Sequence, residues 1–201
     1  MAIVINGSGT VTGISVGGLP DGIVDAGTLA TNSVDSAELI DGSIDTAHIA
    51  ADQITSAILP TGSVVQVVQG GTTTIVTTTT TVFATIMSES ITIADGNKVL
   101  VTICVPVAMN TASIPAAIQV LFSGSSSGTL IADVMVADEH HASSAAFYSV
   151  QSLHAPGSGT SFTYTVQGKL ISGSGDVMWN TTELGGATAS RSSITLMEIK
   201  G

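Results

Sequence analysis

One pentapeptide of this chain has the residue types and spacing of a catalytic serine. Residues 124–128 read GSSSG and fit the G-x-S-x-G pattern of esterases, in which the nucleophile lies on a turn between a strand and a helix. The residues that follow, TLIADVMVA, have the pattern of a strand and not of a helix. The segment therefore predicts a Ser/Gly hairpin between two strands, and catalysis is disfavoured.

A second cluster contains side chains that can bind a metal. Asp138 and Glu139 are followed directly by His140 and His141, and a threefold axis could gather three copies of one histidine. Adjacent residues of a strand point to opposite faces, and polar loops are much commoner than metal sites. We therefore expect a solvent-exposed loop, in which His140 and His141 are the metal candidates, and His154 is expected in a loop as well. The sequence contains no P-loop, dinucleotide fingerprint or zinc spacing, so no cofactor is predicted.

Residues 63–201 have the pattern of a β-rich domain that would carry these loops. Apolar and polar residues alternate, as at Phe162, Tyr164 and Val166, and clusters rich in Gly and Ser separate the segments. This pattern predicts an all-β fold, an antiparallel β-sandwich of the jelly-roll type. The predicted strands are 63–69, 74–86, 89–94, 97–108, 116–123, 128–136, 144–153, 160–171, 175–180 and 192–199.

The composition narrows the class of partner. Hydrophobic residues make up 44% of the 201 residues but aromatic residues only 3%, and the few aromatic side chains, Trp179 and Tyr148 among them, are expected in the core. Lys and Arg total 4 against 15 Asp and Glu, which gives a net charge of -11. Nucleic acids and anionic membranes repel such a surface, so neither is a predicted partner.

The longest apolar stretch, Val99–Met109, is too short to span a bilayer. Cys104 is the only cysteine and is expected on a buried strand.

A ten-residue repeat precedes the β-rich domain. Residues 21–60 divide into DGIVDAGTLA, TNSVDSAELI, DGSIDTAHIA and ADQITSAILP. Large apolar residues recur at every fifth position, which is the period of neither a helix nor a strand. The backbone conformation must therefore change within each unit. The recurring residues are Val24, Leu29, Val34, Leu39, Ile44, Ile49, Ile54 and Leu59, and the same spacing reaches Val64.

Each unit is expected to combine an extended piece with a turn. A β-branched residue followed by Asp favours the extended piece, and Asp35 or Ser36 can cap one helical turn that ends at Leu39. Asp41-Gly42 supplies a reversal of the chain. His48 occupies a position that holds Thr, Glu or Ile in the other units, so it is expected to face solvent.

A ten-residue unit is too short to bury a core of its own. Three chains side by side would remove this difficulty, because each layer would contribute six large apolar groups to a shared axis. A monomeric stack of units and a flexible linker are the alternatives. The constant phase of the apolar residues over four units argues against a linker. We therefore predict a homotrimer in which the eight recurring apolar residues form the interface.

The leader INGSGTVTGISVGGLPDG, the units of the DGSIDTAHIA type and the ending SSITLMEIKG together resemble fibre proteins of tailed bacteriophages, especially marine and cyanobacterial ones. The resemblance covers nearly the whole chain. It implies a trimer in which residues 1–20 dock on other virion proteins, residues 21–62 form a trimeric stalk and residues 63–201 form an outward β-sandwich knob. It also implies a location in the virion after synthesis in the host cytoplasm. The chain is short for a long tail fibre, which leaves a short tail fibre or a capsid fibre open.

Three functions follow from these expectations. The first is a structural, non-enzymatic fibre whose knob contacts a host cell-surface glycan or protein during adsorption, through loops on a rigid scaffold. The second is a capsid decoration protein, or head fibre, that stabilises the shell. The third, a polysaccharide depolymerase, is disfavoured because the sequence has no visible pairing of carboxylates with aromatic platforms. The candidate receptor loops, expected at the distal end of the knob, are 124–128, 138–143, 155–160 and 183–190, with Asp138, Glu139, His140 and His141 as candidate contacts.

Overall fold

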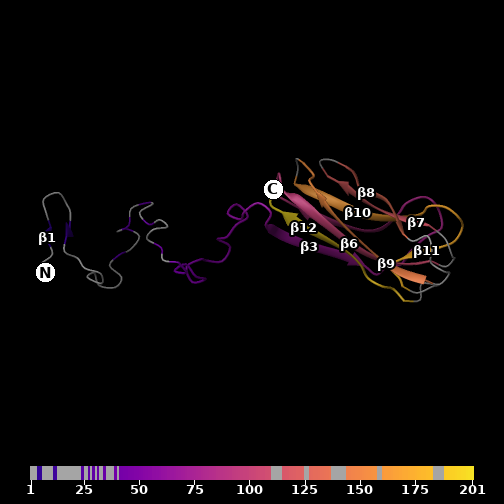
Figure 1. Cartoon of the computed structure of the whole chain (residues 1–201), viewed down its shortest axis with the longest axis horizontal. Coiled ribbons are helices and arrows are strands. Elements are labelled where there is room, and N and C mark those ends of the chain that lie inside the picture. Colours follow the sequence, from indigo (N-terminus) through magenta and orange to yellow (C-terminus); the bar gives the residue numbers. More distant parts are fainter. Residues whose placement is uncertain are drawn as a thin grey trace. The chain divides into compact units, whose positions relative to one another are not determined.

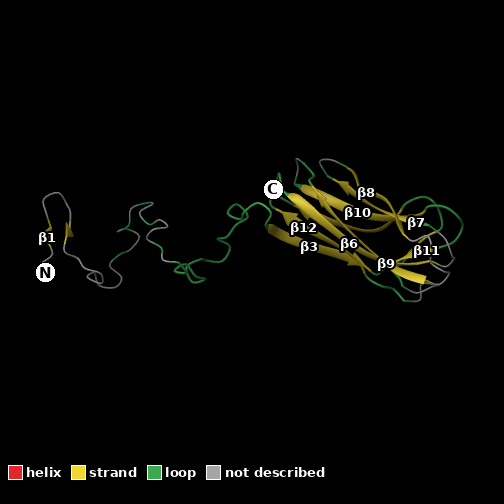
Figure 2. Cartoon of the chain, in the orientation of Figure 1, coloured by secondary structure: helices red, strands yellow, loops and turns green. Residues whose placement is uncertain are grey.

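The computed structural model describes residues 4–5, 11–12, 24, 27, 29, 31, 34, 39, 41–109, 115–124, 127–136, 144–157, 160–182 and 188–201. The chain divides into two units, residues 1–54 and residues 55–201. All regular structure in the described residues is β-strand (Figure 2), so the predicted all-β class is confirmed for them. None of these residues belongs to a helix that is long and apolar enough to cross a membrane.

The second unit contains two antiparallel sheets, drawn as two layers in Figure 1. In the first unit, β1 (Val4–Ile5) pairs with β2 (Val11–Thr12). The first sheet of the second unit consists of β3 (Val64–Thr72), β4 (Val76–Thr78), β6 (Lys98–Met109), β9 (Ser144–His154), β11 (Val177–Trp179) and β12 (Ser192–Ile199). The second sheet consists of β5 (Ala84–Thr92), β7 (Ala116–Ser123), β8 (Gly128–Val136) and β10 (Ser161–Leu170).

The strand pairing is that of a jelly roll. Four antiparallel pairs, β3 with β12, β5 with β10, β6 with β9 and β7 with β8, make the chain one long hairpin that turns at β7–β8. Consecutive pairs alternate between the sheets, whose orders are β3-β12-β6-β9 and β5-β10-β7-β8. Short β11 lies in line with β12 along β6, and β4 pairs with β11. The predicted jelly-roll-like sandwich is therefore confirmed in its strand order.

The core lies between the two sheets and follows the period of two expected for strands. In β10, alternate residues from Phe162 to Leu170 are buried, and the residues between them are partly exposed. The largest fully buried side chains are Trp179, Tyr164 and Phe162, which confirms the core role for these three. Tyr148 is only partly buried against the core, and Phe147 is 66% exposed, so the expected core position is wrong for Phe147. Cys104 lies in β6 as expected, but its side chain is partly exposed because it belongs to the outward-facing set of that strand.

One predicted strand, 74–86, is divided in the structure. β4 ends at Thr78 and β5 begins at Ala84, with five residues between them that leave the sheet. The carbonyl of Thr80 accepts the N–H of Leu170 at 3.0 Å, and its hydroxyl accepts the N–H of Val82 at 3.4 Å. Threonine hydroxyls compete in this way with the strand ladder for backbone groups, which explains why a threonine-rich run breaks.

Gly168 allows the two sheets to approach near the end of β10, where the strand pairs with the first residue of β5. It lies in β10 against the ring of Trp179, and a Cβ at this position would come within 2.4 Å of the ring atoms Cε2 and Cζ2. Trp179 is fully buried, and its Nε1–H donates a hydrogen bond to Thr78 Oγ1 at 2.5 Å. Because the ring cannot move aside without losing this bond, the position has no room for a larger residue.

Gly168→Ala is therefore expected to lower the free energy of unfolding by about 1–3 kcal/mol, the usual cost of overpacking a core. The urea midpoints of the wild type and the variant measure the difference. Ser161→Ala, at the exposed start of the same strand, is the control and should change stability by about 0.5 kcal/mol or less. An unchanged midpoint for Gly168→Ala would show that the sheets can separate here without cost.

Candidate functional site

The described part of the repeat, residues 41–63, forms a backbone turn every five residues. In each turn an N–H donates to the carbonyl three positions earlier, at 3.1 to 3.3 Å. The donors are His48, Gln53, Ile58 and Ser63. Each turn begins one residue after one of the recurring apolar residues. The five-residue period of the sequence is therefore the period of a chain of turns.

Two kinds of turn alternate along this segment. Gly42, Asp52 and Gly62 have positive φ angles of 79°, 65° and 89°. These positive φ angles recur every ten residues. Asp52 and Gly62 are the third residues of the turns that begin at Ala50 and Pro60, and a type II turn requires positive φ at its third residue. The predicted reversal at Asp41-Gly42 is confirmed.

Asp45 organises the turn between two of these reversals. Its Oδ1 accepts the N–H of Ala47 at 2.9 Å and lies 2.8 Å from Nδ1 of His48. The expected Asp-capped helical turn therefore takes the form of a β-turn in this unit, and Asp35 and Ser36 of the preceding unit lie outside the described residues. His48 is exposed, as predicted.

The recurring apolar residues of the repeat, called the apolar ladder below, are exposed in the single chain. Seven of the eight have exposed fractions between 38% for Ile49 and 57% for Ile54, and Leu59 is partly buried. An ordered series of large exposed apolar side chains marks an interaction surface. The ladder comprises Val24, Leu29, Val34, Leu39, Ile44, Ile49, Ile54 and Leu59.

The sandwich has two ends that carry different loops. We call the base the end at which Ser63 leads into β3 and Ile199 ends β12, and the tip the opposite end. Antiparallel pairing places the connections that contain 124–128 and 155–160 at the base. Val136 and Ser144, which flank the 138–143 segment, lie at the tip.

The four candidate receptor loops therefore do not share one end, contrary to expectation. The connection that contains 183–190 is a third case, because it leaves the first sheet between β11 and β12, where Thr181 pairs with Ala189. One strand, β8, separates the 124–128 loop from the connection that contains 138–143, and a single strand carries the chain from one end of the sandwich to the other. Asp138, Glu139, His140 and His141 themselves lie outside the described residues.

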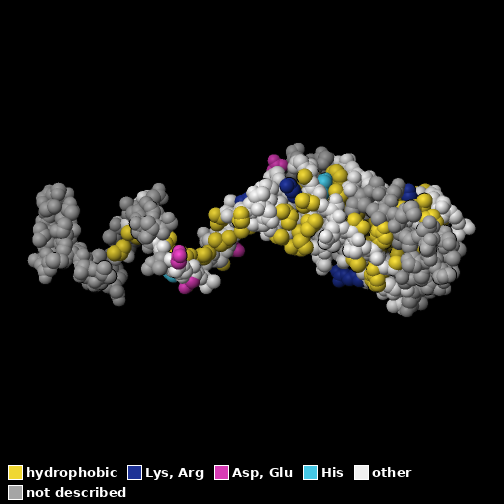
Figure 3. Space-filling model, viewed as in Figure 1, with side chains coloured by type: hydrophobic (Ala, Val, Ile, Leu, Met, Phe, Trp, Pro, Cys, Tyr) yellow, Lys and Arg dark blue, Asp and Glu magenta, His cyan; other side chains and the backbone are white. Residues whose placement is uncertain are grey.

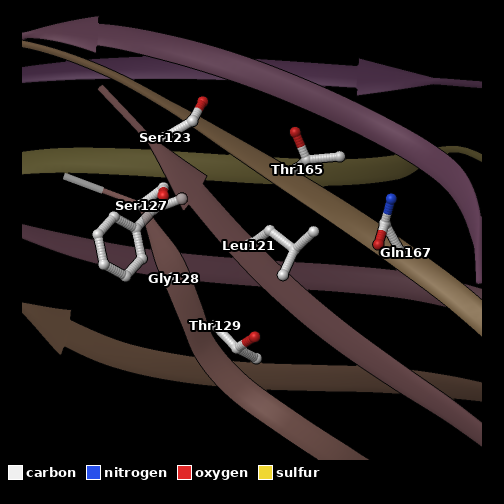
Figure 4. Close-up of a pocket in the computed structure, with 8 residues that line it drawn as sticks. Leu121, Ser123, Ser127, Gly128, Thr129, Thr165 and Gln167 are labelled. Atoms are coloured by element: carbon white, nitrogen blue, oxygen red, sulfur yellow. The ribbon is translucent and has the colours of Figure 1, made fainter. Parts of the chain in front are cut away.

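The GSSSG segment connects β7 to β8 and thus lies between two strands, as the sequence predicts. The strand–turn–helix arrangement of a nucleophile elbow is not present there. Beside it, on the outer face of the second sheet, is an open pocket of about 430 Å³ (Figure 4). Leu121 lies at its centre, with hydroxyl and amide groups around it, and its described lining has no titratable side chain. The lining consists of Leu121, Phe122, Ser123, Ser127, Gly128, Thr129, Thr165 and Gln167.

A buried carboxylate joins the two sheets at the base. Glu198 in β12 is 2% exposed and accepts hydrogen bonds from Gln66 Nε2 at 2.7 Å, the Ala94 N–H at 2.8 Å and Asn97 Nδ2 at 2.5 Å. Burial by itself would raise the pKa of this carboxyl, but the three donors, led by the Ala94 N–H, lower it below its usual value. Glu198 therefore holds β3 and the β5–β6 turn together as a carboxylate.

The last repeat unit is bound to the end of β12. The N–H of Lys200 donates to the carbonyl of Ser63 at 2.9 Å, and the N–H of Gly62 donates to the carbonyl of Lys200 at 2.8 Å. The Lys200 ammonium donates to the carbonyls of Ala57 at 2.9 Å and Leu59 at 2.5 Å. Residues 57–63 therefore have a fixed place against the base of the sandwich.

His154 is the last residue of β9 and is buried, so its expected loop position is wrong. Its Nδ1 lies 2.8 Å from Oη of Tyr164, and its ring centroid lies 4.0 Å from that of Phe122. Burial lowers the pKa of His154 and raises that of Tyr164, which favours the neutral form of both groups. Within the part of the chain that the structure describes, no group of three or more His, Cys, Asp or Glu side chains could hold a metal ion.

No protein-family model matches the chain, and no curated protein matches it. Two solved structures of infectious bursal disease virus are similar to it in part, those of the Gx and Gt strains. The Gx match has a TM-score of 0.39 and 12% identity and covers 68% of this chain and 37% of the other. The Gt match has a TM-score of 0.39 and 10% identity and covers 67% and 38%. The chain thus spans less than two fifths of those chains, and a similarity this weak gives no basis for transferring a role.

Glu198→Gln is expected to lower the free energy of unfolding by about 1–3 kcal/mol at pH 7. The amide NH2 group of Gln would face N–H groups that now donate to the carboxylate, and two donors cannot bond to each other. The folded-state pKa of Glu198 is lowered, so its contribution is complete above its ordinary value of 4.5 and is lost as pH falls below it. Urea unfolding at pH 7 and at pH 3 should therefore show a smaller difference between wild type and variant at the lower pH. Glu89→Gln, at a partly exposed position, controls for the loss of one charge. A constant difference between the two pH values would contradict the assignment.

Proposed function

We propose that this chain is a structural virion protein, a homotrimeric phage fibre whose jelly-roll knob is used in host adsorption. The observation that carries the proposal is the apolar ladder, whose side chains are exposed in the single chain at a constant spacing of five residues. The repeat and both ends of the sequence resemble phage fibre proteins. In this proposal, residues 1–20 dock on other virion proteins, and the chain has no catalytic role.

The ladder supports association because the repeat cannot cover it alone. The chain of turns has a large apolar residue at every fifth position and no second layer to place over it, and Ile58, outside the ladder, is 62% exposed as well. Burying such a side chain stabilises a protein by about 1.5–3 kcal/mol. Three parallel copies would bring the ladder residues of each layer together on one axis and give every layer a small core.

Ile44→Asp and His48→Ala test the trimer as a pair, because Ile44 is 50% exposed and the His48 side chain 57% exposed in the single chain. In a monomer both changes should be mild. In the trimer, Ile44→Asp would gather three uncompensated carboxylates and cost several kcal/mol, whereas His48→Ala should cost about 0.5 kcal/mol or less. Light scattering should give the wild type three times the chain mass, and Tm should fall for Ile44→Asp alone. A stable folded monomer at micromolar concentration, or equal effects of the two changes, would refute the trimer.

Adsorption is distinguished from capsid decoration by competition. Isolated protein, added to host cells before infection, should occupy receptors and slow phage adsorption. Val82→Asp, at a 70% exposed residue of the tip, should reduce this competition more than Ala155→Asp at the base, since recognition lies in loops on a rigid scaffold. Replacing Asp138 with Asn and Glu139 with Gln tests the candidate contacts there.

The decoration alternative makes the opposite forecast. Saturating protein would leave adsorption unchanged, and virions that lack the protein would adsorb normally but lose capsid stability. This pair of results would replace host adsorption with shell stabilisation as the function of the sandwich.

A further inference from the structure

We infer that the outer face of the first sheet, at the base, is a second part of the trimer interface and packs against further copies of this chain. The inference rests on the proposed trimer. It concerns a surface of the sandwich, which is distinct from the apolar ladder and can be tested separately from it.

One row of side chains across the outer face of the first sheet is entirely apolar. The strand register places Val67, Met197, Leu100 and Leu153 side by side on β3, β12, β6 and β9. Their neighbours on β6 and β12 are buried, so the row points outward. Val67 and Leu153 are 55% and 56% exposed. With Val64 and Ile199, the next pair toward the base, these side chains form what we call the base patch: Val64, Val67, Leu100, Leu153, Met197 and Ile199.

The next row toward the tip has a different character. Gln69, Thr195, Thr102 and Gln151 occupy the same four strands there. Gln69 Nε2 donates to Thr195 Oγ1, and Gln151 Nε2 donates to Thr102 Oγ1, both at 3.2 Å. These polar side chains satisfy one another across the sheet, as expected for a face in contact with water. This polar row separates the apolar row at the base from Phe147, which is 66% exposed on β9 nearer the tip.

The base patch adjoins Leu59, the last residue of the apolar ladder. Val64 follows Leu59 by the same five residues that separate the ladder residues. The Lys200 ammonium holds the carbonyl of Leu59, and Lys200 directly follows Ile199 of the patch. Figure 3 shows hydrophobic side chains gathered over β3 on this side of the sandwich. An axis that gathers three copies of Leu59 would therefore pass beside three copies of the base patch.

Charge argues for a second copy of the chain as the occupant. The patch contains no carboxylate, and the chain has a net charge of -11, so an anionic membrane would repel it. Like faces related by a threefold axis bring the apolar row into contact here, with Lys98, the register partner of Ile199, beside it. An interface of standard size buries about 1,600 Å² in total, which a patch of six side chains does not reach without the ladder. The patch should therefore strengthen the trimer and not create it alone.

The test compares Leu153→Asp with Gln151→Asp in the full chain. Both residues are exposed, both face outward, and they are two positions apart on β9. Light scattering over a dilution series measures the concentration at which half of the trimer dissociates. Leu153→Asp should raise this concentration at least about tenfold, and Gln151→Asp should leave it within about twofold. Circular dichroism at high concentration establishes that both variants retain the β fold, and Val67→Asp on β3 is a second patch variant if Leu153→Asp does not fold.

The outcomes separate this inference from the proposed function. A wild type that is monomeric throughout would overturn both. A trimeric wild type with equal dissociation for all variants would overturn the base patch alone and leave the ladder as the interface. Unchanged trimer dissociation combined with loss of the variant from assembled virions would assign the patch to a different virion protein and overturn self-association.

Discussion

Every apolar side chain needs cover from water, and the spacing of these side chains decides whether this chain can supply the cover itself. In the sandwich the spacing is two, so one face of each strand is apolar and two sheets can close on each other. In the repeat the spacing is five, and within the continuously described residues 41–63 each of Ile44, Ile49, Ile54 and Leu59 precedes a turn. A series of turns has no second layer, so the ladder stays exposed in the single chain. The difference between the two units is thus a difference in period.

Within the sandwich, a few polar and steric details decide how closely the sheets approach. Gly168 leaves room for the indole of Trp179 toward the tip, and the hydrogen bond to Thr78 fixes that ring. At the base, Glu198 reaches from one sheet to the β5–β6 turn and is fully supplied with donors. A buried carboxylate without these donors would cost far more than it contributes. The same end of the sandwich holds Ala57 and Leu59, near the end of the repeat, through the Lys200 ammonium.

Local pattern was sufficient to predict the strands, because alternation in segments such as β10 and β12 survives in the structure almost residue for residue. The ends at which the loops lie follow from a count of strands and not from local pattern. The loops 124–128 and 138–143 are separated by the single strand β8, which places them at opposite ends of the sandwich. The inward orientation of His154 and the apolar row of the base patch also escaped prediction, since both depend on the register between strands that are distant in the sequence. The five-residue period was plain in the sequence, but the turns that produce it became clear only from their hydrogen bonds.

Repulsion between carboxylates opposes the proposed association. Its free-energy cost can be compared with the free energy gained by burying the ladder side chains. Residues 21–62 contain seven acidic and no basic residues, so three parallel copies would repel one another. These carboxylates are not in the ladder positions, and Asp45 turns its side chain toward Ala47 and His48 of its own turn. Surface charges farther apart than about 8 Å are largely screened at physiological ionic strength, and an exposed pair contributes about 1 kcal/mol or less. Seven ladder residues are 38–57% exposed in the single chain, so each would gain about half of the ~1.5–3 kcal/mol of full burial. Summed over the ladder, this burial outweighs the repulsion provided that the apolar residues face the axis and the acidic residues face water. The two turn types alternate with a period of ten residues, and this alternation can direct the apolar and the acidic side chains to different sides of the repeat.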